Sequence, residues 1–255
     1  MKKIIINFVF FIIISFLSLI IILSTIGLET DKFNKLISTK ASLTNNIDLK
    51  LNTIKFRANL KELSLFLETQ NPKINYRNIS IPVNNIKAYI DFLPLFKSEL
   101  KIKKISLVLE ELNISQLNEL SIVMKPSNFK SILNNKIKQG KLISEIDIFL
   151  TDKGDLKNFI AKGSVKGLQG NLLSGFNFSN INLSFFADKN DILIKNIFGN
   201  LEDIKISDGD IKLNLEDGIK INSNFNSQFN FDDKLLDKYS NLFNKYKYLL
   251  NLKSL

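Results

Sequence analysis

The first long pattern in the chain is an uncharged apolar segment that runs from Ile4 to Leu28. Isoleucine, phenylalanine, valine and leucine fill most of it, and only a few Asn, Ser, Thr and Gly residues interrupt it. A helix of this length reaches roughly 37 Å at about 1.5 Å per residue, so it can cross a hydrocarbon core of about 30 Å with some tilt. The pattern predicts a transmembrane helix in residues 1–28 rather than a buried core helix.

A cleavable signal peptide is the alternative interpretation of this segment, because Lys2 and Lys3 form a basic start. Signal peptides have an apolar core of about 7 to 15 residues followed by a small-x-small cleavage site, and neither condition is met well here. We therefore expect an uncleaved signal anchor. The basic start favours a cytoplasmic N-terminus, although lysines also follow the span and charge counting decides little. Export of residues 29–255 is the corresponding expectation.

Beyond the anchor, apolar and polar residues alternate with a period of two, which is the pattern of strands with one apolar face. No long helical crossover separates the runs, so we expect an antiparallel meander. The alternating apolar positions are Ile47, Leu49, Leu51, Leu63, Leu65, Leu67, Ile79, Ile81, Val83, Ala88, Ile90, Phe92, Leu100, Ile102, Ile105, Leu107, Leu109, Ile146, Ile148, Leu150, Ile181, Leu183, Phe185, Ile192, Ile194, Ile204, Ile206, Ile211, Leu213, Leu215, Phe225, Phe229 and Phe231.

Turn signals punctuate these runs at residues 151–155, 188–191, 207–210 and 216–218. The Asp-Gly pairs at Asp208-Gly209 and Asp217-Gly218 suit tight hairpins, in which a positive φ is required. The alternation slips at Asn52-Thr53 and again at Asn180, where we expect bulges or bends.

Two segments depart from the strand pattern. Residues 127–138 place apolar side chains at helical spacing and predict a short helix that ends at Gly140. Residues 232–255 predict an amphipathic helix, capped by Asp232 or Asp233, that packs against the open end of the sheet or lies on an anionic lipid surface.

Burial of the one-sided apolar face is the main energetic constraint on the fold. Each large apolar side chain contributes about 1.5 to 3 kcal/mol on burial, so a dozen strands put tens of kcal/mol at stake. Two short helices cannot cover such a face. It closes on a second sheet as a sandwich, or it curls into a trough that something apolar fills. The predicted fold class is mainly β, an N-terminal transmembrane helix followed by an elongated, curled antiparallel sheet with one or two short helices.

Composition removes several classes of chemistry. The 255 residues include no His, no Cys and no Trp, which excludes disulfides, imidazole catalysis and the usual zinc and haem sites. The net charge of +10 comes from lysines scattered over polar strand faces, without the basic and aromatic cluster of a nucleic-acid site. Asp208-Gly209-Asp210 lacks the spacing of a calcium loop, and the neighbours Glu110 and Glu111 point to opposite faces of a strand. We expect no enzyme activity, no cofactor, no metal and no nucleic-acid partner.

The order of features resembles the AsmA-like family of bacterial envelope proteins (the AsmA, TamB and YhdP type). The most specific part comprises residues 79–82, residues 86–96 with the hydrophobic-Pro-Leu segment Phe92 to Leu95, and residues 100–107, which read apolar-x-Ile-x-x-Ile-x-Leu. Residues 108–112 depart from the family, in which a Pro or Gly often precedes the next strand. The resemblance covers the anchor, the first repeats and much of the β region.

This resemblance implies a taco-shaped β-groove, apolar inside, anchored in the bacterial inner membrane by a single pass and extending into the periplasm. It implies carriage of phospholipid or another acyl lipid toward the outer membrane, with outer-membrane or periplasmic proteins as further partners. Residues 29–231 form the expected groove domain. The candidate groove-lining residues are Ile79, Ile81, Ala88, Ile90, Phe92, Ile102, Ile105, Leu107, Phe176, Phe178, Ile181, Leu183, Phe185, Ile211, Leu213, Leu215, Phe229 and Phe231.

Two other functions remain open at the level of sequence. One is a noncatalytic scaffold or assembly factor for outer-membrane proteins, which would pair an exposed sheet edge with a partner strand. The other is a lipopolysaccharide-bridge component of the LptC type, against which the hydrophobic-Pro-Leu segment and the extra strands argue. About twelve strands at roughly 4.8 Å reach only about 58 Å, so we expect a fragment or a short family member that needs partners.

Overall fold

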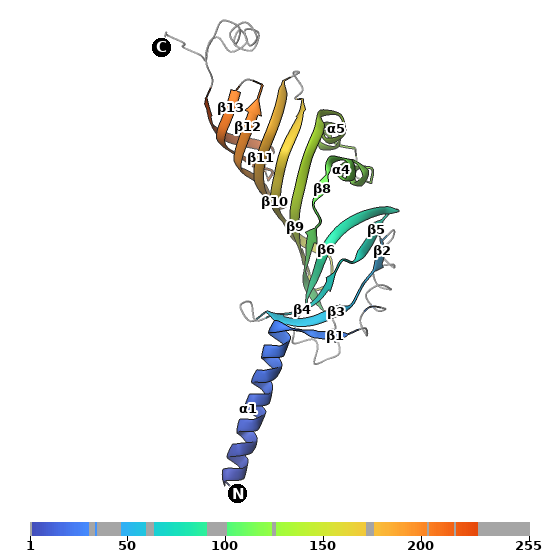
Figure 1. The fold of residues 1–255 in the computed structure, drawn as a ribbon, viewed down its shortest axis with the longest axis vertical. Coiled ribbons are helices and arrows are strands. Elements are labelled where there is room, and N and C mark those ends of the chain that lie inside the picture. The colour runs from blue at the N-terminus through green and yellow to red at the C-terminus, as the bar shows by residue number, and fades with distance from the viewer. Residues whose placement is uncertain are drawn as a thin grey trace, which may run out of the picture.

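The computed structural model describes residues 2–30, 34, 47–59, 64–90, 101–123, 126–171, 176–202, 204–216 and 218–228. These residues form one large antiparallel sheet of 14 strands, curled and unclosed, behind an N-terminal apolar helix. Figure 1 shows the helix projecting from one end of the sheet. The predicted fold class is confirmed. The predictions for Phe92, Phe229 and Phe231 and for a helix over residues 232–255 concern residues outside the described ranges.

The helix α1 spans Lys2–Thr25. Its segment Lys3–Thr25 has a mean hydropathy of 3.0 and none of it is buried in the protein, so it is long and apolar enough to cross a membrane. It ends where Ile26 and Gly27 both donate backbone hydrogen bonds to the Ile22 carbonyl. Gly27 has a φ of 79°, the left-handed conformation that commonly terminates helices. The described chain thus has one candidate single-pass anchor.

The strands follow in chain order, separated mostly by short turns. Their bounds are β1 Leu28–Thr30, β2 Ile47–Lys50, β3 Ile54–Asn59, β4 Ser64–Gln70, β5 Lys73–Tyr76, β6 Ile79–Ile90, β7 Ile102–Leu109, β8 Leu112–Asn113, β9 Ile137–Leu150, β10 Leu156–Asn171, β11 Asn177–Ala187, β12 Asp191–Leu201, β13 Ile204–Asn214 and β14 Lys220–Gln228. The main path of hydrogen-bonded neighbours runs β1-β3-β4-β6-β7-β9-β10-β11-β12-β13-β14. β2 and β5 branch from this path through β6, and β8 pairs with β9.

The long strand β6 carries the branch. Its first half pairs with β5 and its second half pairs with β4. A register shift against β7 lies between Val83 and Asn85, at the point where the alternation of apolar residues changes parity. The alternating positions Ile79, Ile81 and Val83 and the positions Ala88 and Ile90 belong to one strand, because a bulge joins its two halves.

One correction concerns Asp208-Gly209-Asp210, which was predicted to be a hairpin turn. These residues lie in the middle of β13, and Gly209 pairs with Phe225 of β14. Turns separate strands at residues 151–155 and 188–190, as predicted, and β13 ends at Asn214, just before the third predicted turn signal. Asn180 has a φ of 52° and lies at a register shift between β11 and β12, which confirms the bulge expected there. The slip at Asn52-Thr53 is the connection between β2 and β3.

Two short helices lie beside β8 and β9 (Figure 1). α5 spans Asn128–Lys136 and begins at the N-cap Ser127, close to the prediction, but the chain enters β9 at Ile137 and does not continue as helix to Gly140. α4 spans Ile114–Ser121 and was not predicted. Its capping box is complete, because Asn113 Oδ1 accepts from Gln116 N and Gln116 Oε1 accepts from Asn113 N.

Candidate apolar groove

One face of the sheet carries a nearly unbroken apolar row. Residues directly opposite each other on neighbouring strands share a face, so the strand registers trace the row from β3 to β14. Its members are Ile54, Thr69, Ile86, Leu107, Ile146, Ala161, Ala187, Ile192, Leu213 and Ile221. Only Thr69 is polar. At about 4.8 Å per strand, the nine steps of this cavity-face row cover roughly 43 Å.

A second row on the same face lies two residues along each strand. It consists of Phe56, Leu67, Ala88, Ile105, Ile148 and Phe159. Two adjacent apolar rows give this face the width of at least two side chains across the N-terminal half of the sheet. The face is therefore a continuous apolar strip along which an apolar molecule can contact one strand after another.

The strip is roofed at the end nearest α1. There β2, β5 and the first half of β6 fold over the sheet and enclose a cavity of about 350 Å³. This volume is in the range of small-molecule sites. Thirteen of its fifteen lining residues are apolar: Leu49, Leu51, Ile54, Leu67, Glu68, Thr69, Ile74, Ile81, Val83, Ile86, Ala88, Ile102, Ile105, Leu107 and Ile148.

Burial decreases along the cavity-face row. Ile54, under the roof, is 1% exposed and belongs to a small core cluster with Leu67 and Ile90. Ile221, in β14 at the far edge, is 62% exposed. The strip is thus a partly enclosed pouch at the anchor end and an open surface at the other end among the described residues.

The structure brings many of the predicted groove residues together. Ile81, Ala88, Ile102, Ile105 and Leu107 line the cavity. In the C-terminal half, Leu183, Phe185, Ile211 and Leu213 share the parity of the cavity-face row.

The other predicted residues take different places. Ile90 is buried in the core cluster, and Ile79 pairs with Tyr76 at the β5–β6 hairpin. Phe176 is half-buried just before β11, and Leu215 is 36% exposed just after β13. Phe178 and Ile181 lie in β11 on either side of its bulge.

Sequence reasoning missed the roof of the cavity and part of its floor. The apolar lining residues that were not assigned are Leu49, Leu51, Ile54, Leu67, Ile74, Val83, Ile86 and Ile148. Leu49, Leu67 and Ile148 follow the alternating pattern, and their parity was the signal available. The strand β5, which carries Ile74, is only four residues long and has no clear alternation of its own.

Three glycines on the C-terminal strands each lie opposite a phenylalanine. The pairs are Gly163–Phe185, Gly170–Phe178 and Gly209–Phe225. In each pair a Cβ placed on the glycine would lie within 3 Å of the phenylalanine ring, so the ring covers the glycine backbone. In such a pair the phenylalanine ring packs over the glycine and supplies the apolar contact that the glycine itself cannot make.

The opposite face of the sheet is charged. Registers place Glu29, Lys55, Glu68, Lys87, Ser106 and Asp147 in one row across successive strands. Lys55 Nζ lies 3.3 Å from Glu29 Oε1, and Lys87 Nζ lies 3.7 Å from Glu68 Oε1. Ser106 donates a hydrogen bond to Asp147. Alternating charges across strands stabilise this face in water, and the polarity leaves the cavity face as the surface suited to apolar ligands.

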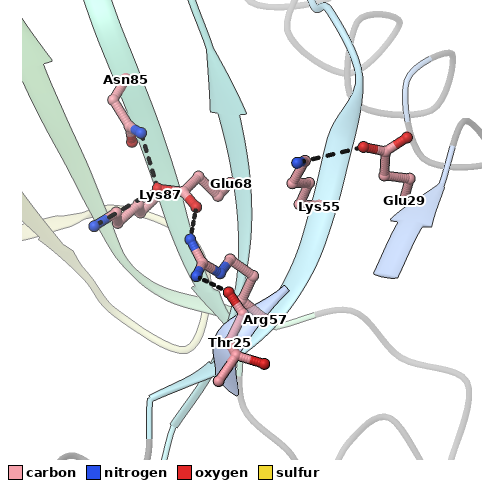
Figure 2. Close-up of polar contacts among 7 residues, drawn as sticks. All are labelled: Thr25, Glu29, Lys55, Arg57, Glu68, Asn85 and Lys87. Atoms are coloured by element: carbon pink, nitrogen blue, oxygen red, sulfur yellow. Dashed lines mark hydrogen bonds and ion pairs between the residues drawn. The ribbon is translucent and has the colours of Figure 1, made fainter. Parts of the chain in front are cut away.

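Glu68 is the most enclosed acid of that row, with a side chain only 6% exposed. Arg57 Nη1 donates to its Oε2 at 2.9 Å, and Asn85 Nδ2 donates to its Oε1 at 2.8 Å (Figure 2). Burial on its own raises the pKa of the Glu68 carboxyl. The hydrogen bonds from Arg57 and Asn85, with the positive charges of Lys87 and Arg57, outweigh burial and hold this pKa below its ordinary value.

Arg57 also joins the sheet to the anchor. Its Nη2 donates to the Thr25 carbonyl at 2.8 Å, at the C-terminal end of α1 (Figure 2). A guanidinium group there satisfies a free helix carbonyl and opposes the negative end of the helix dipole. A Cβ on Gly27 would lie 2.8 Å from Arg57 Cγ, so the glycine leaves room for the arginine stem.

The described residues contain no group of three or more Asp, Glu, His or Cys side chains placed to hold a metal ion. No family model, no curated protein and no solved structure matches the chain. The apolar strip, its roofed cavity and the adjacent anchor helix are the features of the described residues that bear on function.

Proposed function

We propose that this protein is a noncatalytic, membrane-anchored lipid-transfer protein of the bacterial envelope that holds acyl chains along its apolar strip. The cavity-face row carries the proposal, because nine of its ten residues are apolar and it leads from a roofed pouch to an open surface. Acyl chains would cover this strip, while head groups remain in water at the strand ends. The proposed path runs from the inner membrane toward the outer membrane, in line with the AsmA-like resemblance of the sequence.

The geometry supports a lipid better than a compact polar ligand. The cavity has only two polar residues in its lining, and the Glu68 carboxylate is held by partners on the opposite face. The anchor helix reaches the sheet at β1 and β3, next to the roofed end, so lipid leaving a membrane would meet the enclosed part of the strip first. The proposal needs no cofactor and no catalytic side chain.

The test is site-specific photocrosslinking in bacterial cells with the full chain. A photoreactive phenylalanine analogue replaces Ile192, on the cavity face of β12, and in a matched control it replaces Leu193, the adjacent half-buried residue on the opposite face. We expect phospholipid adducts at position 192 and few at position 193, detected by mass spectrometry. Equal labelling of both positions, or labelling of neither, would contradict a lipid path on this face.

A second substitution tests whether lipid reaches β12 along the strip. Leu107→Asp places a charge in the cavity and is expected to reduce adducts at position 192 at least about tenfold, since an unpaired charge against acyl chains costs well over 1.4 kcal/mol. Val108→Asp alters the neighbouring half-buried residue on the opposite face and should leave the adducts unchanged. Protease resistance of both variants confirms that they fold. Undiminished labelling at 192 in Leu107→Asp would mean that lipid does not travel through the cavity.

The scaffold alternative rests on one observation of its own. Residues 220–227 of β14 are all exposed, and no further strand pairs with β14 among the residues that the structure describes. Such an edge offers unpaired backbone groups to a partner strand. The same photoreactive residue at Asn224 distinguishes the two functions, since protein adducts there without lipid adducts at position 192 would favour the scaffold.

A further inference from the structure

A second cavity, separate from the apolar strip, lies where the start of α4 meets β9 and β10. Its volume is about 470 Å³. Its lining is polar and basic: Asn113, Ile114, Ser115, Lys138, Gln139, Gly140, Lys141, Lys166, Gly167 and Gln169. Three of these ten residues are lysines and none is acidic. The lining therefore has the opposite character to the apolar cavity and suits an anion.

The strand register forces two of the lysines together. Lys141 of β9 lies directly opposite Lys166 of β10, and Gln139 lies opposite Gln169 in the next pair. Like charges directly opposite each other destabilise a sheet. Glu111 relieves part of this repulsion, because its Oε1 lies 2.6 Å from Lys141 Nζ. Within the described part of the chain, Lys138 and Lys166 have no ion-pair partner, so uncompensated positive charge remains at the cavity.

Two glycines border this cavity. Gly140 and Gly167 have φ values of 151° and 58°, and a Cβ on Gly167 would meet no atom within 4 Å. Ser115 adds a hydroxyl group to the wall. The capping box of α4 occupies the N–H groups of Asn113 and Gln116 and leaves those of Ile114 and Ser115 without intrahelical partners. Donors of several kinds thus surround one space.

We propose that this cavity binds a phosphate group, with Lys141 and Lys166, which the strand register places side by side, as its principal ligands and Lys138 and Ser115 beside them. A phosphate offers several acceptor oxygens and at least one negative charge, which matches ammonium donors on neighbouring strands. The phosphate comes from a lipid head group or from a free phosphate ion. The site does not require acyl chains in the apolar strip, so it stands or falls separately from the lipid-transfer function.

The experiment uses the full chain in a maltoside detergent, which carries no phosphate. Inorganic phosphate and dihexanoyl phosphatidylglycerol, below its micellar concentration, are titrated in separate arms by calorimetry. Dihexanoylglycerol serves as the phosphate-free control. We expect saturable binding of at least one phosphate probe and none of dihexanoylglycerol at this site. Binding of both probes identifies a free-phosphate site, and binding of the lipid alone identifies a head-group site.

The variant Lys141→Gln/Lys166→Gln removes both ligands and should weaken binding at least about tenfold, since each charge-assisted hydrogen bond contributes about that factor. Lys153→Gln/Lys189→Gln removes the same charge from two exposed turns and should leave binding unchanged. Absence of saturable binding to both probes would overturn the proposal. Equal weakening by the two double variants would also overturn it, because the effect would then be one of net charge.

Discussion

At the scale of single residues, Glu68 is a buried carboxylate in which each oxygen accepts a hydrogen bond. A buried carboxylate is costly unless its oxygens are satisfied, and here Arg57 and Asn85 each donate to one oxygen while Lys87 adds a nearby charge. Arg57 in turn reaches the last carbonyl of α1 at Thr25. A single acid therefore connects three strands to the anchor helix, and both its protonation and its partner can be tested.

The lowered pKa of Glu68 predicts a loss of stability in acid. A carboxyl whose folded pKa lies below its unfolded value stabilises the fold above the unfolded pKa, and this stabilisation is lost as the pH falls from about 4.5 through the folded pKa. The melting temperature of the full chain should fall across this range. Glu68→Gln should be less stable at neutral pH and show a smaller fall. An equal fall in the wild type and in Glu68→Gln would assign the acid sensitivity to other groups.

Replacement of the arginine partner gives a second residue-scale prediction. Arg57→Met leaves Glu68 buried without its main donor and removes the cap from α1, so we expect a loss of about 2 to 3 kcal/mol in unfolding free energy. Lys55→Met on the same strand breaks only the exposed pair with Glu29 and should cost at most about 1 kcal/mol. Chemical denaturation measures both. Similar losses in the two variants would mean that Arg57 contributes no more than a surface pair.

At the scale of strands, the glycine–phenylalanine pairs allow β10, β11, β13 and β14 to approach closely. A Cβ on Gly163 would lie 2.1 Å from the Ile143 carbonyl oxygen and 2.9 Å from the Phe185 ring. Gly163→Ala should therefore destabilise the sheet by about 1 to 3 kcal/mol, the usual cost of overpacking. Ser164→Ala, on the next residue, should change stability by less than about 1 kcal/mol. A thermal melt in which Gly163→Ala matches the wild type would show that the strands can separate without cost.

The limits of sequence reasoning are clearest in two strands. The alternation of apolar residues identified most strand positions, but it did not show that β6 is a single strand, and the turn predicted at residues 207–210 lies inside β13. In β6 a bulge at Val83 to Asn85 mimics the gap between two strands. In β13, the Asp-Gly sequence at Gly209 is typical of a turn, but in the structure the ring of Phe225, sixteen positions later, packs over Gly209 within the sheet. In both strands the local sequence looks the same whether or not a strand distant in the sequence pairs with it. The pairing strand, β7 for β6 and β14 for β13, therefore could not be inferred from the local pattern.

The helix α4 was missed although its signal was present. Asn113 followed three residues later by Gln116 is a capping box, and both reciprocal hydrogen bonds form. For the groove, parity identified apolar faces strand by strand, as at Ile105 and Leu107. The roof formed by β2 and β5 depends on the branch at β6, and nothing in one strand specifies such a branch. The apolar face of each strand could therefore be predicted from the sequence, but the roof over the cavity could not.

At the scale of the whole molecule, the anchor, the pouch and the open strip follow one another in a single sheet. Among the described residues the roof lies at the anchor end, and burial along the cavity-face row falls from Ile54 to Ile221. An apolar molecule would lose contacts gradually as it moves away from the anchor, because each strand exposes more of it to water. Passage along such a surface needs no deep site midway, and a partner at the β14 end would complete the covering.

The twist of the sheet would constrain the kind of lipid that the proposed function could carry. β3 and β4 run across the long axis of the molecule, whereas β9 to β13 run closer to it (Figure 1). At about 20 to 25° per strand pair, the three steps from β4 to β9 turn the strands by roughly 60 to 75°. The apolar row, which crosses the strands, changes direction with them. A saturated hydrocarbon tail can follow this corner by rotating its single bonds, whereas a rigid fused-ring lipid such as a sterol would have to leave the wall there.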